Sequence, residues 1–269
     1  MPKTEVNGIN ISYMVEGQGE PLVMIMGFSA PRIGWVLQRR AFRKYFQLIT
    51  FDSRGVGGSD KPPGPYSMKM MADDTVGLMD HLGIGKAHIL GVSMGGMIAQ
   101  EVAINYPERV RKLVLGSTYA RSDEIGGHSS EYYKALGLEE GCSDDELRGV
   151  AVGKVLGTVF SLAFNSGLYR IGVAPLARVY ARLRASEGVR AQFEAIVGHD
   201  TLDRLHLIEA PTLVITGAGD RLHRPGSSEV IANRIPNAKL VKVEGGSHAF
   251  LVAMRGRFNR EVLDFLRDG

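Results

Sequence analysis

Residues 87–96 read AHILGVSMGG, a short apolar run that leads into a serine flanked by glycines. The run Ala87–Leu90 has the composition of a buried strand, and Met94–Asn105 has the pattern of a helix that stops before Pro107. Ser93 lies at the junction in a G-x-S-x-G arrangement, in which small residues allow a tight turn that exposes the serine hydroxyl. The arrangement predicts Ser93 as a nucleophile, and the alternative is a glycine-rich helix start capped by Ser93.

Similar apolar runs alternate with helical patterns on both sides of this segment. The predicted strands are Thr4–Val6, Ile9–Val15, Leu22–Met26, Gln47–Phe51, Ala87–Leu90, Val110–Leu115, Thr212–Thr216 and Lys239–Val243. The predicted helices that flank them are Ser67–Leu82, Met94–Asn105, Ser227–Arg234 and Phe250–Leu266. Asn7-Gly8 between the first two strands predicts a hairpin turn. This alternation predicts an α/β fold, with a mostly parallel sheet and helices on both of its faces.

Residues 117–207 interrupt the alternation, because they contain helical stretches and no clear strand. The helices predicted there are Ser130–Ala135, Ser143–Val150 and Arg178–Leu183. We therefore expect a core formed by residues 1–116 and 208–269 and a helical lid formed by residues 117–207. Phe160 and Phe164 are candidates to line an apolar substrate site in the lid, and packing within the lid is the alternative for such residues.

A serine nucleophile needs a base, and the base needs a carboxylate that orients it. His248 and Asp220 each follow a predicted strand closely, at the end where open α/β sheets build their sites. We therefore predict His248 as the base of Ser93 and Asp220 as its partner. Asp220 could instead pair with Arg221 or cap a helix, and His223 is near enough to compete with His248. The other five histidines are expected to be structural.

The oxyanion that forms during attack on a carbonyl needs two backbone N–H groups aimed at it. One candidate is the N–H of Met94, the residue after the nucleophile. The other is the N–H of Phe28, which follows Gly27 in the loop after a predicted strand. The Phe28 side chain is also suited to form an apolar wall, and this does not conflict with a role for its amide.

These segments together resemble the α/β-hydrolase superfamily over nearly the whole chain. The resemblance rests on GQGEP at 17–21, MGF at 26–28, FDSRGVGGS at 51–59, GVSMGG at 91–96, GAGD at 217–220 and GSH at 246–248. The order Ser93, Asp220, His248 is that of the family's catalytic residues. The sequence SMGGMIAQ at 93–100 resembles carboxylesterases, enol-lactonases and cofactor-free haloperoxidases and perhydrolases.

Three positions bear on which members of the superfamily the chain resembles. Met26 stands where the family usually has a histidine that supports the oxyanion loop, so this loop must be held in another way. Ala249 follows His248, whereas carbon–carbon bond hydrolases of this fold typically have an aromatic residue there. Ser93 in place of an aspartate disfavours haloalkane dehalogenases and most epoxide hydrolases of this fold.

Composition and missing motifs exclude other classes of function. The chain has 32 basic and 29 acidic residues, a net charge of +3 that gives no electrostatic footprint for nucleic acid. Cys142 is the only cysteine, so no internal disulfide can form. Patterns for a signal peptide, a membrane span, a zinc site or a phosphate-binding loop do not occur. We expect a cytoplasmic protein with no metal, no cofactor and a small molecule as its partner.

The sequence as a whole predicts a serine carboxylesterase that cleaves small to medium apolar esters through an acyl-enzyme. A lactonase or a perhydrolase with the same triad is one alternative. A ligand-binding receptor of this fold with vestigial hydrolysis is an alternative from another class. The sequence does not indicate the physiological substrate or the oligomeric state.

Overall fold

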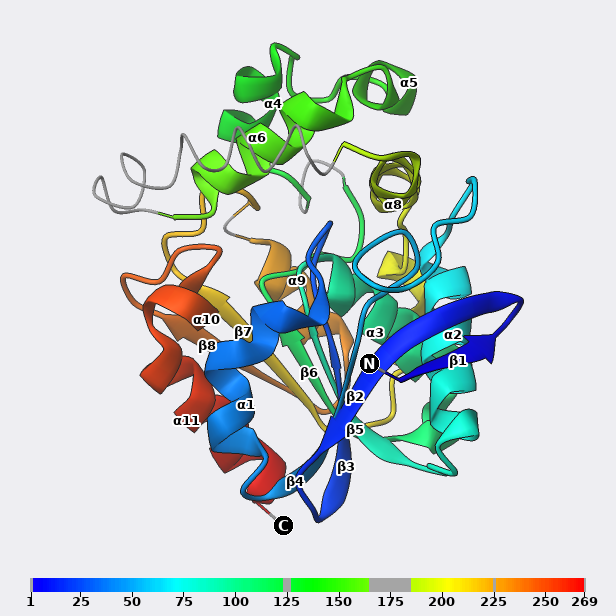
Figure 1. Cartoon of the computed structure of the whole chain (residues 1–269). Coiled ribbons are helices and arrows are strands. Elements are labelled where there is room, and N and C mark those ends of the chain that lie inside the picture. The colour runs from blue at the N-terminus through cyan, green and yellow to red at the C-terminus, as the bar shows by residue number, and fades with distance from the viewer. Residues whose placement is uncertain (1, 123–126, 165–184, 225, 269) are drawn as a thin grey trace.

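The computed structural model describes residues 2–122, 127–164, 185–224 and 226–268. Its centre is an eight-stranded sheet in the order β1-β2-β4-β3-β5-β6-β7-β8 (Figure 1). The strands are β1 (Lys3–Val6), β2 (Ile9–Glu16), β3 (Glu20–Ile25), β4 (Phe46–Phe51), β5 (Ala87–Val92), β6 (Val110–Gly116), β7 (Thr212–Gly217) and β8 (Ala238–Val243). β2 pairs antiparallel with β1 and β4, and the other neighbours are parallel. The predicted α/β fold with a mostly parallel sheet is therefore confirmed.

Helices connect the strands, and α2 (Met68–His81) has a capping residue at its start and a glycine after its end. Those that pack on the sheet are α1 (Val36–Phe42), α2 (Met68–His81), α3 (Met94–Asn105), α9 (Ser227–Arg234), α10 (Phe250–Ala253) and α11 (Arg255–Arg267). Ser67 caps α2 by accepting a hydrogen bond from the backbone N–H of Met70, and Gly83 follows the helix with φ +67°. Within the described ranges, no helix combines the length and apolar composition that a membrane span requires.

The central strands bury apolar side chains on both faces. In β3, Val23 and Ile25 belong to the core cluster covered by α2, α3 and α9. Leu22 and Met24 belong to the opposite cluster, covered by α1, α10 and α11. Side chains alternate across a strand, so a strand buried on both faces has an uninterrupted apolar sequence. Each such side chain contributes about 1.5–3 kcal/mol by leaving water.

Two helical regions differ from the prediction. Helix α1 was not predicted; its seven residues follow a short 3-10 turn (Arg32–Trp35) and give little periodic signal. The predicted helix Phe250–Leu266 is broken at Met254, whose φ of −122° and ψ of 40° are not helical. The break allows Phe250 of α10 and Phe258 of α11 to pack edge to face, with ring centroids 5.4 Å apart.

The described residues between β6 and β7 are helical, with no strand among them. They form α4 (Ser130–Leu136), α5 (Asp144–Arg148), α6 (Val152–Leu162), α8 (Glu187–Val197) and a 3-10 turn (Leu202–Leu207). Figure 1 shows α4, α5, α6 and α8 beyond one edge of the sheet. Tyr132, Leu147 and Phe193 pack together in a cluster of their own. The stretch Arg178–Leu183 lies outside the described residues, and the assignment of 117–207 as a lid stays a prediction.

Candidate active site

Ser93 occupies a strained turn between β5 and α3. Its backbone has φ 54° and ψ −124°, a combination that non-glycine residues rarely adopt and that costs on the order of 1–3 kcal/mol. The flanking glycines permit the turn, because a Cβ on Gly91 would collide with the carbonyl of Gly95, and a Cβ on Gly95 would collide with the carbonyl of Ile25. The strand-to-helix turn predicted from the G-x-S-x-G sequence is therefore present.

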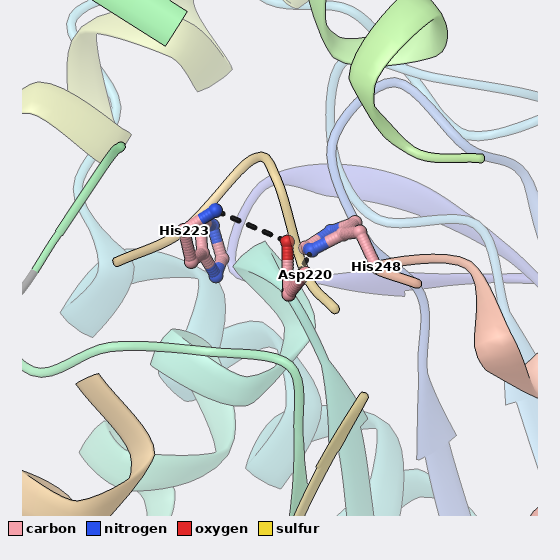
Figure 2. Close-up of side chains that lie close together, drawn as sticks. All are labelled: Asp220, His223 and His248. Carbon is pink, nitrogen blue, oxygen red and sulfur yellow. Dashed lines mark hydrogen bonds and ion pairs between the residues drawn. The ribbon is translucent and has the colours of Figure 1, made fainter. Parts of the chain in front are cut away.

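Asp220 and His248 are in direct contact, although 28 residues separate them in the chain. Nδ1 of His248 lies 2.8 Å from Oδ2 of Asp220. Figure 2 shows the two side chains next to each other. Oδ1 of Asp220 accepts the backbone N–H groups of Leu222 at 2.9 Å and His223 at 3.1 Å. A hydrogen bond donated by Nδ1–H to the carboxylate leaves Nε2 of His248 as a proton acceptor.

The neighbours of Asp220 keep it ionised. Burial raises the pKa of its carboxyl group, but the charge of His248, its hydrogen bond and the adjacent His223 outweigh burial and lower this pKa to about 2. An ionised carboxylate that accepts the Nδ1–H of His248 fixes one tautomer and stabilises the imidazolium form of the ring.

Ser93 and the Asp220–His248 pair lie at the same edge of the sheet. β5, β7 and β8 are parallel, so the residues that follow them meet at their carboxyl ends. His223 is close to both Ser93 and the Asp220–His248 pair. It lines a cavity together with Ser93, and the centroid of its ring is 4.6 Å from that of the His248 ring. Among the described residues, no hydrogen bond links the Ser93 hydroxyl to His248, and such bonds commonly tighten only when substrate binds.

Phe28 and Met94, the two oxyanion candidates, adjoin Ser93. Met94 is the first residue of α3, where a backbone N–H has no acceptor within the helix. A Cβ on Gly27 would lie 3.2 Å from the Cβ of Ser93, so the backbone that leads into Phe28 passes directly beside the serine. Phe28 and Met94 both line the cavity that contains Ser93.

Comparisons with known proteins identify the family. Residues 20–252 match the family profile described as the alpha/beta hydrolase fold. The chain belongs to this family. It is 30% identical to a Caulobacter segnis protein named as a carbamate hydrolase, RutD, over 95% of this chain and 96% of the relative. The recognised superfamily and fold are thereby confirmed, and the protein is a hydrolase.

Two solved structures resemble the hydrolase closely. The enol-lactonase from Burkholderia xenovorans LB400 is 25% identical, with a TM-score of 0.83 over 99% of this chain and 100% of the other. A thermophilic esterase from Thermogutta terrifontis, with malate bound, is 29% identical, with a TM-score of 0.81 over 98% of this chain and 96% of the other. The names of these relatives therefore refer to three kinds of hydrolase, an enol-lactonase, an esterase and a carbamate hydrolase.

The loop that carries Phe28 is held from the helical insertion of the hydrolase, by a residue that the sequence analysis missed. Gln192 of α8 is fully buried and accepts the backbone N–H of Ser29 through Oε1 at 3.1 Å. Its Nε2 donates to the carbonyl of Arg54 at 2.7 Å. Met26, which cannot supply these hydrogen bonds, packs its methyl group against Gly34. No sequence signal marks Gln192, because 163 residues separate it from Ser29.

The wall of the cavity beside Ser93 is mainly apolar. Its described lining consists of Phe28, Ser93, Met94, Met97, His128, Tyr132, Val155, Val159, Phe193, Ile196, Leu222 and His223. The insertion contributes through α6 and α8, as expected, but α6 presents Val155 and Val159 to the cavity. Phe160 and Phe164, which we predicted to line it, are half-buried and are not among the described lining residues.

Asp220, His223 and His248 are also the one group of described residues whose donor atoms lie close enough to hold a cation, within 4.8 Å of one another. Both oxygens of Asp220 already accept N–H groups, from Leu222, His223 and His248. A cation would have to displace these donors, so the observed contacts suit a hydrogen-bonded acid–base pair better than a metal site.

Proposed function

We propose that this hydrolase cleaves carboxylic esters through an acyl-enzyme on Ser93, with His248 as the base and Asp220 as the partner that orients it. The observation that carries this proposal is the 2.8 Å contact between His248 and Asp220 at the sheet edge where Ser93 occupies its strained turn. The apolar cavity beside Ser93 suits small to medium uncharged esters.

The reaction follows from these positions. Oγ of Ser93 attacks the ester carbonyl while Nε2 of His248 takes its proton, and the N–H groups of Phe28 and Met94 bind the resulting oxyanion. When the tetrahedral intermediate collapses, the bond to the alkoxy oxygen breaks and His248 returns the proton to the leaving alcohol. Water then repeats both steps on the acyl-enzyme, releasing the carboxylic acid and free Ser93.

The described residues between β6 and β7 serve in this proposal as the lid of the site. Val155 and Val159 of α6 and Phe193 and Ile196 of α8 form part of the cavity wall. A wall supplied by an insertion shields the site from bulk solvent and can set the length of the acyl chain.

Replacement of Ser93 by alanine tests the proposal on short p-nitrophenyl esters. We expect kcat to fall by about 10⁴–10⁶-fold, because the acyl-enzyme can no longer form. Ser117→Ala is the matched control: Ser117 directly follows the neighbouring strand β6, is buried and also has a positive φ of 41°. Turnover in Ser93→Ala equal to that of the wild type, or failure of a serine-reactive phosphonate to label Ser93, would overturn the proposal.

A lactonase with the same residues is the second candidate, favoured by the similarity to the Burkholderia xenovorans enol-lactonase. Competition between a lactone and an acyclic ester distinguishes the two by kcat/KM, and addition of peroxide tests for perhydrolysis. A receptor with vestigial hydrolysis would instead bind a small ligand tightly and show negligible turnover with every ester.

A further inference from the structure

Two buried histidines without an assigned role line the cavity beside Ser93. His128 precedes α4 and His223 follows β7, and their backbones form an isolated antiparallel bridge. Their side-chain rings have centroids 5.4 Å apart, and the two residues are only 6% and 4% exposed. Apart from Ser93 and the phenol of Tyr132, the other described residues of the cavity wall are apolar.

Each ring has a nitrogen atom that forms no well-aligned hydrogen bond with the part of the chain that the structure describes. Nδ1 of His128 and Nδ1 of His223 are buried without a hydrogen-bond partner among the described residues. The backbone carbonyl of Leu222, which accepts the N–H of Ser129 at 2.9 Å, is the polar group of the backbone that interacts with the His128 ring. Buried polar atoms are nearly always paired, so unpaired atoms in a cavity wall point to a partner that arrives with a ligand.

Neighbouring aromatic residues hold these rings in place. The His128 ring is stacked on Tyr132 with centroids 3.8 Å apart, and its Nε2 lies 3.5 Å from the hydroxyl of the buried Tyr119. The His223 ring packs edge to face against Tyr119 at 5.0 Å and against His248 at 4.6 Å. Rings fixed in this way can discriminate between groups of similar size, because they do not move to accommodate the wrong one.

The charge state of the two rings selects the kind of group they can bind. Burial lowers the pKa of His128 to about 3 and holds the pKa of His223 well below its ordinary value. Both rings are therefore neutral near pH 7, and each offers one N–H donor and one nitrogen acceptor. A neutral donor and acceptor suit a hydroxyl or carbonyl oxygen and give no cation to neutralise a carboxylate.

We propose that His128 and His223 form a polar subsite that binds an uncharged hydroxyl or carbonyl oxygen on the substrate. The inference rests on the proposed function, since it places this oxygen on the part of the ester that enters the cavity beside Ser93. The contact between the rings of His223 and His248 places the subsite next to the reacting carbonyl. The natural substrate class is then a short ester substituted with a hydroxyl or keto group, rather than a plain alkyl ester.

The test compares esters that differ only by a hydroxyl in place of a methyl group. On the acyl side the pair is ethyl 3-hydroxybutyrate and ethyl 3-methylbutyrate, and on the alcohol side it is 2-hydroxypropyl acetate and isobutyl acetate. We expect the wild-type protein to prefer the hydroxyl member of one pair by at least about tenfold in kcat/KM. Ratios near one in both pairs, or a stronger preference for ethyl hydrogen succinate, would overturn the inference.

Substitutions then assign the preference to the two rings. His128→Phe and His223→Phe should each bring the ratio close to one by lowering turnover of the hydroxyl ester. His199→Phe is the matched control, because His199 is also buried and packs against Tyr119 but lines a different cleft, between α2 and α8. A hydroxyl preference that survives both cavity substitutions would contradict the assignment.

A binding measurement separates failure of this inference from failure of the proposed function. The same four esters are titrated into Ser93→Ala and their dissociation constants measured by ligand-observed NMR, which needs no turnover. If the wild type does not hydrolyse any of the esters but Ser93→Ala binds the hydroxyl members more tightly, the proposed function fails and the subsite stands. If Ser93-dependent hydrolysis occurs without discrimination in either assay, the subsite fails and the proposed function stands.

Discussion

The geometry of Ser93 depends on the absence of side chains on both sides of it. Gly91 and Gly95 approach each other and the end of β3 so closely that a Cβ on either would meet a backbone carbonyl. A backbone carbonyl cannot move aside as the end of a flexible side chain can. The glycines of G-x-S-x-G are therefore required by the packing of β3, β5 and α3 as well as by the turn itself.

Gly95→Ala should consequently destabilise the protein and abolish turnover together. We expect a loss of about 3 kcal/mol in the free energy of unfolding, because the new Cβ forces α3 away from the carbonyl of Ile25. Gly85→Ala is the control, since nothing lies within 4 Å of a Cβ there, and its effect should stay within about 0.5 kcal/mol. Urea unfolding curves compare the two variants, and equal stabilities would contradict the packing argument.

Helix α8 and the loop after β3 form a connected unit at the scale of elements. Gln192 connects the backbone of Ser29 to that of Arg54, and the backbone N–H of Arg32 donates to Asp52 at 2.7 Å. The side chains of Arg32 and Asp52 also form a buried ion pair. The loop is thus fixed from both sides without the histidine that Met26 replaces.

Gln192→Leu should lower kcat more than it changes KM. The substitution removes both hydrogen bonds, so the loop can shift and misplace the N–H of Phe28, for which we expect a loss of about a hundredfold in kcat. Gln100→Leu is the control: Gln100 is equally buried and connects Tyr119 to Thr201, away from this loop. Steady-state kinetics and thermal melting together separate an effect on the position of the loop from an effect on stability. Equal kcat values in the two variants would show that Gln192 acts only on stability.

The accuracy with which the sequence predicts a helix or strand depends on how completely that element is buried. The central strands are apolar on both faces and bounded by glycine, so all eight strands were predicted to within two residues at most of their ends. The short helix α1 was missed, because two exposed apolar residues, Ile33 just before it and Val36 at its start, obscure the periodic pattern. The break at Met254 was missed because the apolar pattern continues across it.

At the scale of the whole molecule, the sequence predicted the residues that follow strands but not those that reach across the fold. Asp220 and His248 could be paired in advance because β7 and β8 are parallel neighbours. The contact of Gln192 with Ser29 joins the insertion to the core and depends on the tertiary arrangement. Similarly, the five histidines predicted to be structural include His128, which lines the cavity beside Ser93.

Buried histidines give the whole molecule a dependence of stability on pH. Burial lowers the pKa of His199 to about 4 and of His128 to about 3, against about 6.5 in an unfolded chain. A group whose pKa is lower in the folded state than in the unfolded state takes up its proton at a higher pH in the unfolded state. Lowering the pH therefore favours unfolding. The group's contribution to stability is complete above about pH 6.5 and is lost as the pH falls toward the folded pKa.

When the pH falls from 7.5 to 5.0, each of these histidines should lower the free energy of unfolding by about 2 kcal/mol. His199 gives the cleanest test, because it is buried and lies away from the Ser93 cavity. His199→Phe should reduce the loss of stability over this interval by about 2 kcal/mol, measured by urea unfolding at both pH values. His206→Phe, at an exposed position, should leave the loss as in the wild type. If His199→Phe loses as much stability as the wild type, the histidine is not buried in its neutral form.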